Sequence, residues 1–131
     1  MLFRSAPCTA PTAVVASGNS LPGVPRVSLF AELGYEHRPW GLDVGLEWRR
    51  ISKVYVDDRN TDAAPAAAVV NLRAALTQKV GKWKFKEFVR VDNLSAKNYA
   101  GSVIVNEANG RFFEPAPSRS WLMGLTVGYA F

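Results

Sequence analysis

The final fourteen residues of the chain, Ser118 to Phe131, alternate between large apolar side chains and small or weakly polar ones. The large apolar residues fall at every second position: Trp121, Met123, Leu125, Val127, Tyr129 and Phe131. A repeat of two residues is that of a β-strand, whose successive side chains point to opposite faces of a sheet, and it argues against a helix. We therefore expect a strand with one apolar face and with aromatic side chains at both ends, where such side chains commonly meet a membrane interface.

Four earlier stretches carry the same alternation, which predicts strands beginning near Arg26, Leu42, Ala67 and Trp83. A tight turn containing Pro39 and Gly41 joins the first two predicted strands, and a second turn around Gly81 joins the next two. The sequence thus predicts an all-β, antiparallel fold of about five long strands in an up-and-down meander.

The connections between the predicted strands are alternately short and long. A polar loop spans 57–65, and a connection of more than twenty residues spans 93–119. Inside the longer connection, Asn109-Gly110 predicts the tip of a hairpin. Residues 1–24, rich in Ala, Pro, Ser and Thr, are expected to form a loop or to be disordered, while 25–131 hold the strands and two outer loops.

Three residues interrupt the alternation. Phe30 lies among polar positions of the first strand, and in the fourth strand Glu87 takes an apolar position and Phe88 a polar one. For Glu87 and Phe88 we expect a β-bulge or a contact with another segment of the chain.

Strands of ten to twelve residues, tilted by about 45°, can cross the apolar band of a membrane of about 25 Å. The face opposite the apolar one is charged, and the chain has no further layer that could cover an apolar face in water. The charged residues in the strands are Asp43, Glu47, Arg49, Arg73, Lys84, Lys86, Arg90 and Asp92. The pattern favours the wall of a transmembrane β-barrel. Because five strands cannot close such a barrel, the chain is expected to be a fragment of a larger barrel or to assemble with copies of itself.

Composition narrows the possible functions. The formal net charge is +5, but Lys and Arg are scattered along the chain, so we expect no nucleic-acid partner. The chain contains one cysteine, Cys8, and one histidine, His37, which exclude an internal disulfide and a Cys/His zinc site. We find no catalytic constellation and expect neither an enzyme nor a bound cofactor. Asp57, Asp58 and Asp62 lack the ligand spacing of a calcium loop.

Several segments resemble the C-terminal part of TonB-dependent outer-membrane receptors. The resemblance rests on Leu21-Pro22-Gly23-Val24-Pro25, on the segment 90–94 followed by Lys97, Tyr99 and 101–103, and on 106–107, 110–117 and the last strand. It implies the last strands of a 22-stranded barrel in the bacterial outer membrane, in the version seen in receptors for ferric siderophores and related metal chelates. Residues 1–17 match nothing that we associate with the family.

The resemblance also implies partners. They are outer-membrane lipid, the barrel-assembly machinery and, for the complete receptor, a ferric chelate substrate. TonB is expected to act only through an N-terminal plug, which this sequence does not include, so the chain is not expected to transport anything by itself. In the family, the terminal alternating strand is the barrel-assembly signal, which corresponds here to Leu125, Val127, Tyr129 and Phe131.

Four charged residues of the predicted outer loops are candidate contacts for an anionic chelate: Arg59, Glu107, Arg111 and Arg119. Ordinary solvation of loop residues is the competing interpretation. Two further functions stay open on the sequence alone. One is a small soluble β-domain that binds an acidic ligand or partner, and the other is a self-assembling small outer-membrane barrel.

Overall fold

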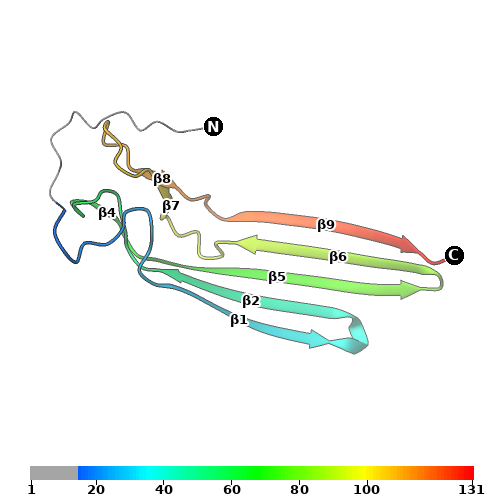
Figure 1. The fold of residues 1–131 in the computed structure, drawn as a ribbon. Helices are drawn as coiled ribbons and strands as arrows, with labels where there is room; N and C mark the ends of the chain where they lie inside the picture. The colour runs from blue at the N-terminus through cyan, green and yellow to red at the C-terminus, as the bar shows by residue number, and fades with distance from the viewer. Residues whose placement is uncertain (1–14) are drawn as a thin grey trace, which may run out of the picture.

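The structure, a computed structural model, describes residues 15–131 and shows a long, curved sheet with loops gathered at one end (Figure 1). The sequence predictions for 1–14, including those on Cys8, lie outside the described residues. Five long strands form the sheet: β1 (Ser28–His37), β2 (Leu42–Ile51), β5 (Ala67–Val80), β6 (Trp83–Asp92) and β9 (Ser120–Tyr129). The predicted all-β meander is therefore confirmed, with boundaries close to those expected from the alternation.

Each long strand pairs antiparallel with the next one along the chain, in the order β1-β2-β5-β6-β9. Tight turns close β1–β2 and β5–β6 at what we call the short-turn end. The short 3-10 helix η1 (Arg38–Trp40) makes the first of these turns, and Gly41 follows it with a φ of 66°. Because Gly41 packs against the backbone of Thr77, an added Cβ there would lie 2.0 Å from the Thr77 carbonyl oxygen.

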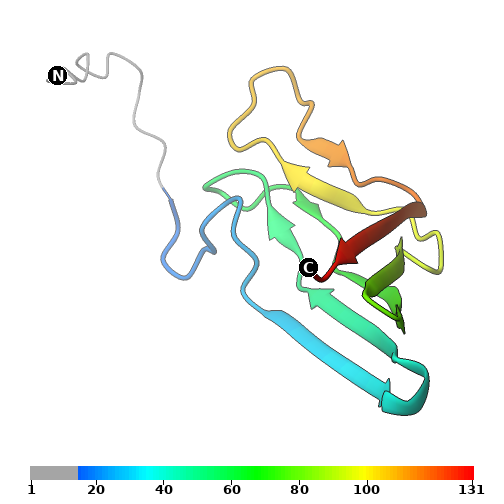
Figure 2. The same cartoon turned by 90° about the vertical axis from the view of Figure 1, so that its right-hand side faces the viewer.

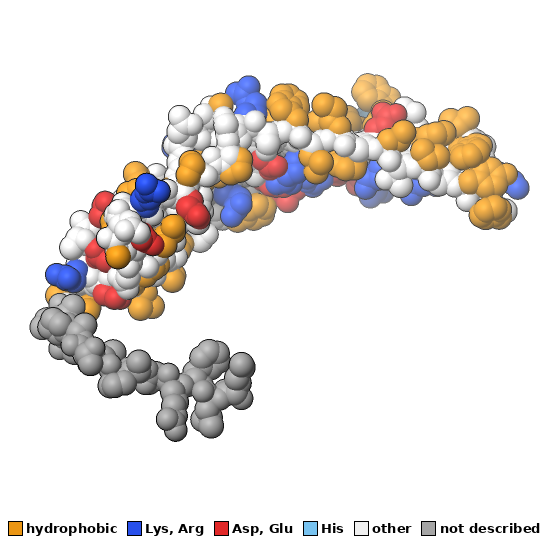
Figure 3. All heavy atoms as spheres, turned by 90° about the horizontal axis from the view of Figure 1, so that it is seen from above, with side chains coloured by type: hydrophobic (Ala, Val, Ile, Leu, Met, Phe, Trp, Pro, Cys, Tyr) orange, Lys and Arg blue, Asp and Glu red, His pale blue; other side chains and the backbone are white. Residues whose placement is uncertain are grey.

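The register sorts the side chains onto two faces. One face carries the side chains of odd-numbered residues in β1, β6 and β9 and of even-numbered residues in β2 and β5, which are paired with one another between neighbouring strands. We call this the apolar face. The other side chains make the polar face. Figure 3 shows hydrophobic side chains gathered along one side of the sheet and charged ones along the other.

No other element of the described chain covers either face, and Figure 2 shows the strands as a single curved layer. On the apolar face Leu33 is 74% exposed, Met123 72% and Leu125 62%. Leu42, Leu72 and Leu125 lie on this same uncovered face and are not packed in an interior. The structure therefore offers no support for the soluble β-domain, since water would meet a large apolar surface.

Packing is concentrated at the other end of the sheet, which we call the long-loop end. The described residues less than a tenth exposed include Val56, Ala64, Ala67, Val69, Asn71, Val91 and Asn93. These seven lie in the loops or in the adjoining ends of β5 and β6, and one further buried residue, Gly45, lies within β2.

The expected bulge at Glu87 and Phe88 is wrong. Glu87 lies opposite Leu76 and Leu125, and Phe88 lies opposite Ala75 and Gly124, without any shift in register. Phe88 belongs on the polar face because its ring fills the space above Gly124, where an added Cβ would lie 2.3 Å from the ring. Packing against Gly124 therefore explains why Phe88 interrupts the alternation. Glu87 remains a charged residue on the apolar face.

Aromatic side chains cluster at the short-turn end. Tyr129 packs edge-on against Trp83 at 4.8 Å and against Phe131 at 5.4 Å between ring centroids. Trp40 packs against His37 at 4.7 Å. Among residues 15–131 no helix has the length and apolarity needed to cross a membrane.

Candidate functional site: the outer loops and the charged face

Two long loops project beyond the sheet at the long-loop end, and each contains a small strand pair. In the first loop, β3 (Val54–Tyr55) pairs with β4 (Ala63–Ala64), and in the second, β7 (Ala100–Val103) pairs with β8 (Phe113–Pro115). The β7–β8 pair is the hairpin predicted from Asn109-Gly110. The β3–β4 pair was not predicted, because strands of two residues each are too short to show an alternation.

The two loops are joined to each other. The backbone N–H of Asn106 donates to the Val56 carbonyl at 2.9 Å, and the Asn106 side chain donates to Asp58 at 3.0 Å. Val56 is fully buried at this junction.

The segment that precedes β1 is attached to the same junction. Ser20 and Asn60 exchange two hydrogen bonds of 2.8 and 2.9 Å, and the Gly23 N–H donates to the Tyr55 carbonyl at 2.8 Å. Three segments distant in sequence therefore form one structured cluster, which we call the outer-loop cluster.

Asn93 connects this cluster to the sheet. It is buried, has a φ of 53°, and its side chain exchanges hydrogen bonds of 2.8 and 2.9 Å with the backbone of Lys97. Its own N–H donates to the buried Asn71 of β5 at 2.9 Å. Asn tolerates this left-handed conformation better than most residues, so Asn93 both ends β6 and shapes the loop.

The structure distributes the four candidate chelate contacts unevenly. Arg59 and Glu107 are sequence neighbours of the bonded pair Asp58 and Asn106, so both belong to the outer-loop cluster. Arg111 begins the return to β8 and Arg119 directly precedes β9. Glu107 is partly engaged in its own turn, since its carboxylate accepts two hydrogen bonds from Asn109 at 2.9 and 3.1 Å. The three arginines are exposed, and their side chains make no hydrogen bond or ion pair within the described part of the chain.

The three acidic residues of the first loop, Asp57, Asp58 and Asp62, accept hydrogen bonds that hold the loops in shape. Asp57 accepts hydrogen bonds from the side chain and the backbone of Thr61, and these bonds lower the pKa of its carboxyl group. Asp58 accepts from Asn106, and Asp62 accepts from the backbone N–H of Ala63. Within residues 15–131 no group of three or more acidic, His or Cys side chains is placed to hold a metal ion.

A second feature of chemical interest is a network of ion pairs on the polar face. Arg73 of β5 bonds to Glu32 of β1 and to Asp43 of β2. Its side chain lies directly over Gly45, where an added Cβ would come within 2.6 Å of the guanidinium.

Arg90 of β6 reaches past β5 to make a two-pronged contact with Glu47 of β2, both bonds being 2.8 Å long. It also contacts Asp92 at 2.9 Å. Asn71 completes this group by donating to Glu47 at 3.2 Å. The sequence placed these residues on one face, but their pairing could be found only from the register.

The residues expected to form the barrel-assembly signal lie along the apolar side of β9 and past its end. Leu125, Val127 and Tyr129 are 62%, 48% and 44% exposed, and Phe131 is fully exposed.

Comparisons with known proteins agree with this geometry. Residues 4–99 match the family described as "TonB dependent receptor-like, beta-barrel". The expectation that residues 1–17 match nothing in the family is therefore wrong from residue 4 onward.

The structure also matches part of BauA, the ferric preacinetobactin receptor from Acinetobacter baumannii, with a TM-score of 0.68 and 16% sequence identity. The match covers 84% of this chain and 16% of the BauA chain. This chain thus spans about a sixth of the length of that receptor, and at this identity the likeness concerns the fold alone.

The family consists of receptors, not of enzymes, which agrees with the absence of a catalytic constellation from the sequence. Its members lie in the bacterial outer membrane, where an uncovered apolar face meets hydrocarbon. On the family match, the five-stranded wall and the structural likeness, this chain belongs to the β-barrel family of TonB-dependent outer-membrane receptors.

Proposed function

We propose that this chain supplies wall strands and outer loops to a receptor that takes up ferric siderophores or similar metal chelates. The observation that carries the proposal is the outer-loop cluster, which places Arg59 and Glu107 around one hydrogen-bonded junction outside the wall. Transport itself belongs to the complete receptor, in which TonB acts through the plug, and the five strands described here form only a part of the wall.

The three loop arginines support an anionic substrate. Arg59, Arg111 and Arg119 are exposed, and a guanidinium presents a fork of donors that matches carboxylate and other planar anionic groups. Ferric chelates that carry net negative charge fit this chemistry.

The test is chelate binding by the complete receptor with each arginine replaced by Gln. Because one lost contact to an anion costs about 1 kcal/mol or more, we expect Arg59→Gln or Arg111→Gln to weaken binding about fivefold or more. Arg38→Gln is the matched control, since Arg38 is also exposed but lies at the short-turn end. Unchanged affinity in all three loop variants, tested with hydroxamate, catecholate and carboxylate ferric chelates, would remove the basis for this substrate class.

We further propose that Leu125, Val127, Tyr129 and Phe131 act as the barrel-assembly signal. The proposal is supported by their alignment on one exposed face of β9. A protein of the assembly machinery can bind such a strand through its backbone and its apolar side chains. Phe131→Ala and Tyr129→Ala should reduce the fraction of heat-resistant assembled protein in outer membranes. Thr126→Ala, on the opposite face of the same strand, should leave that fraction unchanged.

A further inference from the structure

A basic pocket lies at the long-loop end, on the apolar side of the wall. It is a hollow of about 500 Å³ lined by Val27, Arg50, Ser52, Lys53, Pro65 and Ala66. Arg50 belongs to the apolar face, because it lies opposite Leu29 of β1 and Ala68 of β5. Figure 3 shows a positively charged group on the hydrophobic side of the sheet. We call this hollow the outer-rim pocket.

The floor of the pocket continues the strand pair β1–β2 beyond its last residues. The Ser52 N–H donates to the Val27 carbonyl at 2.9 Å, and the Val27 N–H donates to the Ser52 hydroxyl oxygen at 3.1 Å. These bonds extend the pairing by one step past Ser28 and Ile51. The two cations of the pocket therefore flank a hydrogen-bonded strand end.

Both cations are available to an anion. Arg50 and Lys53 are exposed, and within residues 15–131 no carboxylate lies within 4.0 Å of either side-chain cation. The Lys53 amine lies 4.7 Å from the centre of the Tyr55 ring, a cation–π contact that restricts where the ammonium group can lie. A guanidinium and an ammonium group lining one hollow match a phosphate, which accepts several charge-assisted hydrogen bonds.

The surroundings of the pocket favour a lipid as the source of the phosphate. Leu29, directly opposite Arg50, is 48% exposed, and Trp48, 37% exposed, follows on the same face toward the middle of the wall. This face meets hydrocarbon in an outer membrane. Trp48 and Arg50 are two residues apart along β2, or about 7 Å. An acyl chain can therefore cover Leu29 and Trp48 while the headgroup of the same molecule reaches Arg50.

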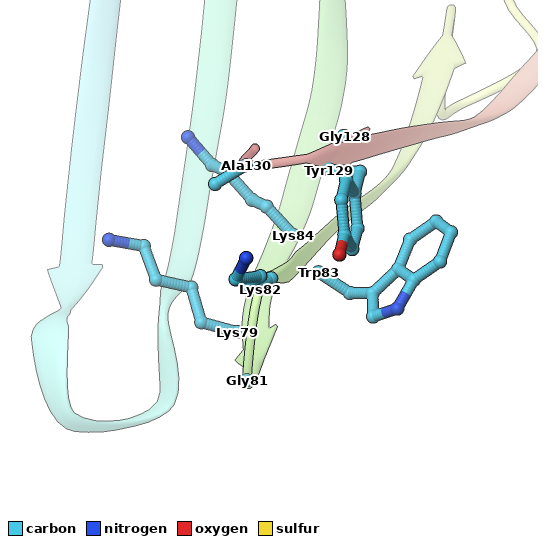
Figure 4. Close-up of a pocket in the computed structure, with 8 residues that line it drawn as sticks. All are labelled: Lys79, Gly81, Lys82, Trp83, Lys84, Gly128, Tyr129 and Ala130. Carbon is cyan, nitrogen blue, oxygen red and sulfur yellow. The ribbon is translucent and has the colours of Figure 1, made fainter.

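The other rim of the wall lacks this combination. At the short-turn end, a hollow of about 470 Å³ is lined by Lys79, Lys82 and Lys84 together with Trp83 and Tyr129. Figure 4 shows Lys79 and Lys84 projecting to one side of the sheet, away from Trp83 and Tyr129. Lys82 has its amine 5.9 Å from the centre of the Tyr129 ring. This hollow therefore offers one amine to the lipid side, whereas the outer-rim pocket offers two cations.

We propose that the outer-rim pocket binds a phosphate of a lipid headgroup in the outer leaflet, which is the leaflet on the side of the long loops. Arg50 donates a forked pair of hydrogen bonds to the phosphate, Lys53 supplies a second positive charge, and the acyl chain packs on Leu29 and Trp48. The inference rests on the placement of the strands in the outer membrane and is independent of the chelate proposed as substrate.

Lipid binding by the complete receptor in a neutral detergent tests the proposal. The probe is diphosphorylated lipid A, and its fully dephosphorylated form is the matched ligand, both measured by native mass spectrometry. We expect the dephosphorylated form to bind about tenfold more weakly, because it offers no phosphate to the two cations. High salt should reduce the difference, since both cations are exposed.

Two double variants of equal charge locate the site. Arg50→Gln/Lys53→Gln should weaken binding of the phosphorylated probe by about tenfold or more, because both charge-assisted contacts are lost. Arg38→Gln/Lys82→Gln, which removes two cations at the short-turn end, should leave the affinity within about twofold. Arg50→Lys keeps the charge but loses the forked donors, and it should weaken binding about threefold.

All variants are compared as heat-modifiable, assembled barrels, so that a folding defect is not counted as lost binding. Equal binding of the dephosphorylated lipid or equal losses in the two double variants would overturn the proposal. Competition by inorganic phosphate at the same concentration as the lipid would do so as well, since it would identify a site for a free anion. Ferric chelate affinity should stay within about twofold in Arg50→Gln/Lys53→Gln, because Arg50 lies on the face opposite the interior. Failure here is therefore distinct from failure of the proposed substrate class.

Discussion

Arg90 shows how a single side chain can connect strands that are not neighbours. It contacts Glu47 through two bonds across β5, while Asn71 on the intervening strand donates to the same carboxylate. Bidentate guanidinium contacts to carboxylate are among the stronger polar interactions, and both side chains here are mostly shielded, Glu47 being 12% exposed. The contact therefore joins β2 and β6 across β5 on the polar face.

A double-mutant cycle measures this contact. In the assembled barrel, Arg90→Gln should lower the free energy of unfolding by about 1–3 kcal/mol, because Glu47 loses its cation. Adding Glu47→Gln should recover part of the loss, with a coupling of about 1 kcal/mol or more. Arg49→Gln on the same face, where no ion pair is formed, serves as the control. Purely additive losses in urea unfolding would show that the contact contributes nothing.

Glu87 is the residue whose placement tests the apolar face most sharply. It lies near the middle of β6 between Leu76 and Leu125, where a carboxylate in hydrocarbon is costly. We expect Glu87→Leu to raise the free energy of unfolding from lipid vesicles by about 1 kcal/mol, less than the value known for a cation at the midplane.

The same exchange on the opposite face provides the comparison. Glu47→Leu removes the partner of Arg90 and should destabilise the barrel. Equal effects of the two exchanges would mean that β6 does not present Glu87 to lipid.

At the scale of elements, the pair β6–β9 depends on the fit of Phe88 over Gly124. The ring covers the glycine so closely that an added methyl group would overlap it. We expect Gly124→Ala to destabilise the assembled barrel by about 1–3 kcal/mol, as overpacking commonly does.

Two variants separate this packing effect from a general intolerance of glycine replacement. In a Phe88→Ala background the cost of Gly124→Ala should fall close to zero, because the overlapping ring is gone. Gly34→Ala should be near neutral, since nothing lies within 4 Å of the added atom. A cost that persists without the Phe88 ring would contradict the proposed contact.

The strands were predictable because alternation is a local property. The strand β2, for example, could be predicted without knowing its neighbours, from the alternating apolar residues Leu42, Val44, Leu46 and Trp48. For Phe88 the expected bulge was wrong and the expected contact with another segment was right, but the partner, Gly124, could be named only once the register was known. The pairing of Arg90 with Glu47 was hidden for the same reason.

The outer loops were predictable in position, but of their internal structure only the β7–β8 hairpin was predicted. Their cohesion depends on hydrogen bonds between residues far apart in the sequence, from 32 positions for Gly23 with Tyr55 to 50 positions for Val56 with Asn106. No local pattern reports such contacts. Asn93 is an exception in part, because an Asn at the end of a strand pattern commonly begins a turn.

At the scale of the whole molecule, the packed interior and the strands occupy different regions. Apart from Gly45, which lies within β2 beneath the Arg73 side chain, the buried residues among 15–131 belong to the outer loops and to the strand ends beneath them, while the greater part of the sheet is a single uncovered layer. Such a layer is stable only if hydrocarbon covers its apolar face and further strands pair with the free edges of β1 and β9. The stability of these five strands therefore depends on the membrane and on the neighbouring strands of the barrel.

The most direct test of this account is a cysteine scan of β9 in lipid vesicles, in a Cys8→Ser background. Single cysteines at positions 121 to 129 are labelled with a fluorophore, and quenching by a lipid-chain spin label is compared with quenching by a water-soluble ion. The account predicts strong lipid-side quenching at odd positions, including 123, 125 and 127, and water-side quenching at even positions. Quenching without a two-residue period, or odd positions shielded from lipid, would contradict the claim that one face of this wall meets the membrane.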